Sequence, residues 1–127
     1  MKLRIKGNSI RLRLTQSEVE DIIKGKAVKE TVSFGDVSPS FHYVLESDSA
    51  SKAVSAHYTE HTICIQLPEA EANSWATTEQ VGIEREIPLQ KDESLYVLIE
   101  KDFQCLHQRP REDEQDNFPN PAAESKA

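Results

Sequence analysis

The first fourteen residues hold the side chains whose types and spacing are best suited to chemistry. Five cations stand there without a single acid, and they are Lys2, Arg4, Lys6, Arg11 and Arg13. Arginine guanidinium groups bind phosphate and carboxylate groups through paired N–H donors, and lysine adds a compact positive charge. The segment is therefore a candidate binding site for an anionic group such as a phosphate, a nucleotide or a carboxylate.

Two short strands joined by a tight turn are predicted to position these cations. Apolar and polar residues alternate on both sides of Gly7-Asn8, and this pair of residues is typical of a two-residue hairpin turn. In that register Arg4 faces Arg11, and Lys2 faces Arg13. Like charges placed opposite each other destabilise a pair of strands by about 0.2–1 kcal/mol per pair. We therefore expect negative charge to lie over this face.

Two sources could supply that negative charge. The internal candidates are Glu84, Glu86, Glu100 and the acidic cluster at 112–116. The external candidate is a small anionic ligand bound by the five cations. A solvated face without a specific partner is the third alternative. If the acidic tail covers the cations, an acidic ligand has to displace it.

The candidates for a metal site are weaker. Glu84 and Glu86 share one face of a predicted strand, and paired carboxylates can hold Mg²⁺ or act as acid and base. Cys105 and His107, together with His61 and Cys64, contain the two sulfur and two nitrogen ligands of a structural zinc site. Residues three apart in a strand point to opposite faces, however, so His61 and Cys64 converge only across a bulge. We predict no cofactor and keep Glu84, Glu86, Cys105 and His107 as candidate metal ligands.

The distribution of charge limits the classes of partner. The 127 residues carry a net charge of −7, but residues 1–14 carry +5 and the remainder −12. An acidic protein is not expected to bind nucleic acid or an acidic membrane, and no apolar run is long enough for a membrane helix. With two cysteines and no secretory leader, a cytoplasmic protein is expected. An exposed sheet edge could pair two copies in a homodimer.

Alternation with a period of two continues along the chain and predicts further strands. They are 28–34, 41–46, 53–58, 61–67, 81–87 and 95–101. The last is placed centrally because 95–99 is apolar on both faces apart from Tyr96. One short helix follows a capping box of Thr15 and Glu18, a second begins at Pro68, and no internal repeat is evident. We predict an α+β domain over 1–108 with a mainly antiparallel, strongly curved sheet or partial barrel of seven or eight strands. An acidic, proline-rich tail, 109–127, is expected to be disordered or loosely docked.

Several segments carry a resemblance to a known family. The sequence reads LRIKGNSIRLRLTQSEV at 3–19, QVGI at 80–83, LIEKDFQCL at 98–106 and NP at 120–121. In these segments it resembles a family of small uncharacterised proteins from Bacteroidetes and related bacteria, nearly end to end. The resemblance implies a bacterial cytosolic protein and carries over no catalytic residue or cofactor. The alternating acids and bases also resemble those of triphosphate-binding tunnel enzymes, although 2–6 reads KLRIK where those enzymes have ExExK.

A small, non-enzymatic binding or interaction protein is the function that these patterns favour. Its basic hairpin face would accept an anionic group from a ligand or from its own tail. The first alternative is a metal-dependent phosphate-ester or triphosphate hydrolase, which needs Glu84 and Glu86 within about 4–6 Å of the cations in a concave pocket. The second is a zinc-stabilised module. The sequence has no GxSxG, no HExxH and no glycine-rich phosphate loop, which disfavours an enzyme.

Overall fold

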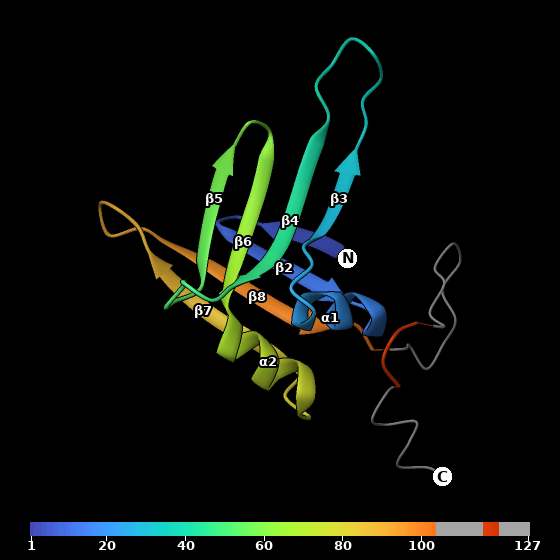
Figure 1. Cartoon of the computed structure of the whole chain (residues 1–127). Coiled ribbons are helices and arrows are strands. Elements are labelled where there is room, and N and C mark those ends of the chain that lie inside the picture. Colours follow the sequence, from blue (N-terminus) through green and yellow to red (C-terminus); the bar gives the residue numbers. More distant parts are fainter. Residues whose placement is uncertain (104–115, 120–127) are drawn as a thin grey trace.

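The structure, a computed structural model, describes residues 1–103 and 116–119. In this part of the chain it has eight strands and two helices (Figure 1). The strands are β1 (Lys2–Lys6), β2 (Ser9–Leu14), β3 (Val28–Val32), β4 (Phe41–Asp48), β5 (Ser55–Thr59), β6 (Thr62–Pro68), β7 (Gly82–Pro88) and β8 (Ser94–Lys101). The helices are α1 (Gln16–Ile23) and α2 (Glu69–Thr77). Every predicted strand and helix is present, with ends that differ by a residue or two.

The strands divide between two four-stranded sheets. Sheet A has the order β1-β2-β8-β7 and sheet B the order β3-β4-β6-β5. The outer pairs of each sheet are antiparallel, as predicted, but the central pairs, β2 with β8 and β4 with β6, are parallel. The central position predicted for β8 is confirmed. The strongly curved sheet or partial barrel is not confirmed. The parallel central pairs were not predicted, because alternation along a strand does not reveal which distant strand becomes its parallel neighbour.

The chain is built from two copies of one structural unit. Each half runs strand, strand, helix, strand, strand, and each sheet takes one hairpin from either half. The rows of paired residues also correspond. Across sheet A the row is Leu3, Leu12, Ile99 and Ile83, and across sheet B it is Ala56, Ile65, Leu45 and Val28. The expectation of no internal repeat is therefore wrong at the level of structure.

The two sheets and both helices share one apolar core. In Figure 1 sheet B lies in front of sheet A, and α1 and α2 lie together at one end of the sheets. Buried side chains come from every layer, among them Leu12, Ile22, Leu45, Ile65, Trp75 and Ile99. The Trp75 indole N–H donates to the Val81 carbonyl at 3.0 Å, so its one polar atom is satisfied. No helix in the described part of the chain has the length and apolar character needed to cross a membrane.

Alternation of side chains gives each sheet an inner and an outer face. On sheet A the inner face carries the row of Leu3, Leu12, Ile99 and Ile83, which belongs to the shared core. The side chains of the rows on either side of this one, such as Arg4, Arg11, Leu98 and Glu84, point away from the core and form the outer face of sheet A. The corresponding outer face of sheet B carries Cys64 and Gln66 at its centre.

The segment 116–119 packs against the end of β8 and the start of α1. Phe118 forms an isolated parallel bridge with Phe103, and its backbone N–H donates to the Asp102 carbonyl at 2.8 Å. Asn117 is buried, and Gln16 Nε2 donates to its carbonyl at 3.1 Å. The remainder of the tail, including 112–115 of the acidic cluster, lies outside the described residues.

A candidate anion-binding face on sheet A

The predicted register of the first hairpin is confirmed. Lys6 pairs with Ser9, Arg4 with Arg11, and Lys2 with Arg13, on either side of Gly7-Asn8. Gly7 has φ 55°, a conformation that glycine adopts without strain. Because side chains alternate, the five cations all lie on the outer face of sheet A, opposite the core. We call this group of five the cationic cluster.

Glu100 supplies the principal counter-charge. It lies on β8 beside Arg13, and its side chain is 11% exposed. Its Oε1 atom accepts hydrogen bonds from Arg11 Nε at 2.6 Å and from Arg13 Nε at 2.7 Å. Burial opposes ionisation, but the two guanidinium groups outweigh it and hold the pKa of Glu100 below its usual value. Of the expected internal acids that lie in the described part of the chain, Glu100 is the one that forms ion pairs with these arginines.

A second, deeply buried acid lies beside Lys2, at the start of β1. Lys2 Nζ is 3.0 Å from Asp102 Oδ2, and the Asp102 side chain is only 2% exposed. Asp102 was not among the counter-charges expected from the sequence. Its position just after β8 follows from the parallel pairing of β8 with β2, a pairing that local alternation does not reveal.

The cationic cluster borders a hollow of about 280 Å³ on the outer face. Its lining residues are Arg4, Lys6, Ser9, Ile10, Arg11, Tyr96 and Leu98. Arg4 and Lys6 are exposed, and within 1–103 and 116–119 no acid forms an ion pair with either of them. The hollow therefore combines positive charge from β1 and β2 with an aromatic and an aliphatic side chain from β8.

Glu84 and Glu86 share this outer face but lie on its far side. Glu84 pairs with Leu98, which pairs in turn with Arg11, so the backbones of Glu84 and Arg11 lie two strand spacings apart, about 10 Å in all. Partial burial and a hydrogen bond with Glu84 raise the pKa of Tyr96. Ser94 Oγ donates to Glu86 at 2.8 Å. In the described part of the chain no ion pair joins Glu84 or Glu86 to the cations, so the structure gives the hydrolase alternative no support.

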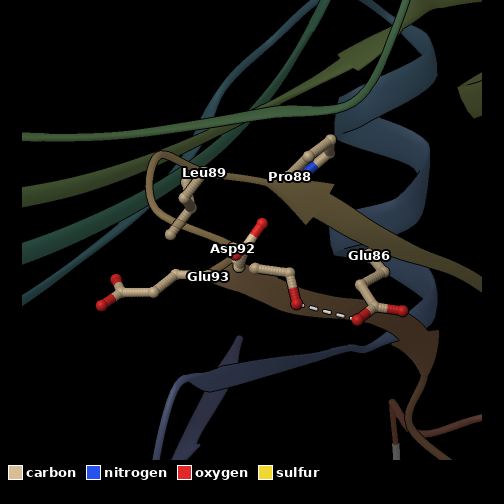
Figure 2. A pocket seen from close by; sticks show the side chains of 6 residues that line it. Glu86, Pro88, Leu89, Asp92 and Glu93 are labelled. Carbon is tan, nitrogen blue, oxygen red and sulfur yellow. Dashed lines mark hydrogen bonds between the residues drawn. The ribbon is translucent and has the colours of Figure 1, made fainter.

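A second hollow, of about 480 Å³, lies at the turn between β7 and β8 (Figure 2). It is acidic, with Glu86, Asp92 and Glu93 in its lining. Figure 2 shows that Glu93 points away from Glu86, and Glu86 accepts the hydrogen bond from Ser94 Oγ. Among the described residues no group of three acidic, histidine or cysteine side chains could hold a metal ion. The candidate ligands Cys105 and His107 lie outside the described residues.

Cys64 lies on the outer face of sheet B and has no metal-like surroundings. Its Sγ donates to Glu46 Oε1 at 3.6 Å, and Gln66 Nε2 donates to the same oxygen atom at 2.8 Å. Partial burial, together with the Glu46 carboxylate, raises the pKa of Cys64 to about 11. The thiol is therefore protonated at neutral pH, as a structural cysteine is.

Sequence reasoning missed four lining residues of the hollow, Ser9 and Ile10 on β2 and Tyr96 and Leu98 on β8. Tyr96 was visible as the one residue with a polar group in the segment 95–99, which is otherwise apolar on both faces. Its place beside Ser9, and that of Leu98 beside Arg11, depend on the parallel pairing of β2 with β8.

Comparison with known proteins identifies a family whose function is unknown. No curated protein and no solved structure matches this chain. A family of unknown function, DUF7009, matches residues 1–122. That match spans nearly all of the sequence, and the chain belongs to this family of unknown function.

Proposed function

We propose that the protein is a small binding protein whose cationic cluster accepts an anionic group. The observation that carries the proposal is the geometry of Arg11 and Arg13 on Glu100. Both guanidinium groups use Nε to bind one oxygen atom, Oε1. Their terminal nitrogens bind no acceptor among the described residues. These nitrogens are donors with which arginine binds phosphate and carboxylate groups.

The balance of charge on this face also favours an anion. Among the described residues the five cations of the cluster form ion pairs with two acids, Glu100 and Asp102, and Arg4 and Lys6 form none. Arg4 and Arg11 stand directly opposite each other, a placement that costs stability unless negative charge lies between them. A bound anion would offset this repulsion.

The repeated unit provides an internal comparison. Glu46 in sheet B occupies the position of Glu100 in sheet A, because each lies beside the equivalent residue of the neighbouring parallel strand. Where Glu100 accepts from two arginines, Glu46 accepts from the neutral donors Cys64 and Gln66. The same fold is therefore built in sheet B without cations at these positions. This comparison supports a role for the arginines beyond holding the sheet together.

Calorimetric titration of the full chain with inorganic phosphate and pyrophosphate tests the proposal. We expect binding to the wild type and a loss of at least about tenfold in Arg4→Gln and in Arg11→Gln, because a charged hydrogen bond contributes about 1.5–3 kcal/mol. Lys29→Gln is the matched control, since Lys29 is an exposed cation on the outer face of an edge strand of sheet B. Absence of binding, or equal weakening by all three variants, overturns the proposal.

A further inference from the structure

The hollow beside the cationic cluster has two chemically different walls. Resting on the function proposed above, we propose that its ligand is a phosphate monoester of a planar aromatic group. The phosphate lies among Arg4, Lys6 and Arg11, and the ring lies over Tyr96 and Leu98.

The size of the hollow exceeds that of a bare phosphate. Its volume is about 280 Å³, whereas one water molecule in the liquid occupies about 30 Å³. A tetrahedral anion takes the place of only a few such waters. The space that remains lies against Tyr96 and Leu98, so an apolar extension of the ligand would fill it.

The register sets the distance between the two walls. Leu98 pairs with Arg11, and Tyr96 pairs with Ser9, on directly neighbouring strands. Neighbouring strands lie about 4.8 Å apart. This spacing is comparable with the separation between phosphorus and ring centre when a single ester oxygen joins them. A ligand with a long flexible spacer would carry its apolar group past the aromatic wall.

Tyr96 is held in place as a surface for stacking. Its backbone N–H donates to the Asn8 carbonyl at 3.1 Å, and it is paired on both sides, with Ser9 of β2 and with Glu86 of β7. A fixed aromatic ring loses little entropy when a second ring packs on it, and aromatic pairs prefer offset or edge-to-face contact. The Glu84 carboxylate at the far edge repels a second anionic group, so the phosphate is directed to the arginine side.

The number of donors favours a phosphate over a carboxylate. Arg4, Lys6 and Arg11 line the hollow from two strands and bring three positive charges to it. A phosphate monoester presents three terminal oxygens and close to two negative charges at neutral pH. A carboxylate presents two oxygens and one charge, and therefore satisfies fewer of these donors.

Titration of the full chain with phenyl phosphate, methyl phosphate and benzoate tests the inference. We expect phenyl phosphate to bind at least about fivefold more tightly than methyl phosphate, in line with an aromatic contact of about 1 kcal/mol. The ratio of the affinity for phenyl phosphate to that for methyl phosphate should stay the same in Tyr96→Phe and fall to about one in Tyr96→Ala. Tyr58→Ala, which removes an exposed tyrosine from sheet B, is the matched control and should keep the preference.

The outcomes separate this inference from the proposed function. Equal binding of phenyl and methyl phosphate overturns the aromatic ligand but leaves the anion-binding function standing. Benzoate binding as tightly as phenyl phosphate overturns the choice of a phosphate monoester. If none of the three anions and no inorganic phosphate binds, both proposals fail.

Discussion

Asp116 lies against Ser17 at the first turn of α1, 99 residues away along the chain. Its side chain accepts hydrogen bonds from the Ser17 backbone N–H at 3.3 Å and from the Ser17 hydroxyl. Its carbonyl accepts a further bond from the Gln16 N–H at 2.9 Å. These contacts satisfy N–H groups that a helix leaves free at its start and place negative charge at the positive end of its dipole.

Removal of this contact should destabilise the protein. Asp116→Ala is expected to lower the free energy of unfolding in urea by about 0.5–2 kcal/mol, the usual cost of losing a helix cap. Asp36→Ala removes an exposed acid from the loop between β3 and β4 and should change stability by less than about 0.5 kcal/mol. Equal stabilities of the two variants would show that segment 116–119 does not stabilise α1.

The ion cluster around Glu100 should make stability depend on pH. Because Arg11 and Arg13 hold the pKa of Glu100 below its usual 4.5, the unfolded chain binds the proton more readily than the folded one. The stabilisation from Glu100 is therefore present above about pH 4.5 and is lost as the pH falls through the lower, folded-state pKa. Urea unfolding of the wild type and of Glu100→Gln between about pH 3 and 7 measures the contribution of Glu100 to the free energy of unfolding at each pH.

We expect Glu100→Gln to cost about 1.5–3 kcal/mol at neutral pH and progressively less below about pH 4.5. Glu46→Gln is the matched control, since Glu46 holds the equivalent position and binds neutral donors. It should cost less at neutral pH. A difference between wild type and Glu100→Gln that stays constant down to pH 3 would contradict this account.

Arg4 is expected to affect stability and binding in opposite directions. It is exposed, faces Arg11, and has no acidic partner among the described residues, so Arg4→Thr should raise the free energy of unfolding by about 0.2–1 kcal/mol without ligand. The same variant should bind phosphate more weakly. Lys29→Thr, which faces Val44, should change neither measurement appreciably. A loss of stability in Arg4→Thr would mean that this side chain contributes contacts to the folded sheet that outweigh the repulsion.

The sequence predicts local features of the fold well because short-range physical chemistry determines them. The pairing of Arg4 with Arg11 follows from alternation around Gly7-Asn8, and the confirmed capping contact of Glu18 with the Thr15 N–H, at 3.0 Å, follows from helix-start chemistry. The parallel pairing of β2 with β8 depends instead on how distant hairpins meet across a shared core. Local patterns therefore reveal the cations but not the Tyr96 and Leu98 wall beside them.

The repeat escaped sequence reasoning for a related reason. The two halves keep apolar residues at equivalent inner positions, such as Val19 and Ile22 in α1 and Ala72 and Trp75 in α2. Apolar spacing of this kind is common to amphipathic elements in general and does not identify a repeat. The outer positions have diverged, with arginine in one half where cysteine or glutamine stands in the other, so no shared motif remains.

Cys64 should be an unreactive thiol. Partial burial and Glu46 raise its pKa from 9.0 to about 11, which lowers the thiolate fraction at neutral pH by about a hundredfold. In a Cys105→Ser variant, which leaves Cys64 as the sole cysteine, alkylation by iodoacetamide at about pH 8 should be correspondingly slower in the folded protein than in urea. Adding Glu46→Gln removes the nearby negative charge and should speed alkylation of the folded protein. Rapid alkylation of folded Cys105→Ser would show that the Glu46 contact does not protect the thiol, and would reopen Cys64 as a chemically active residue.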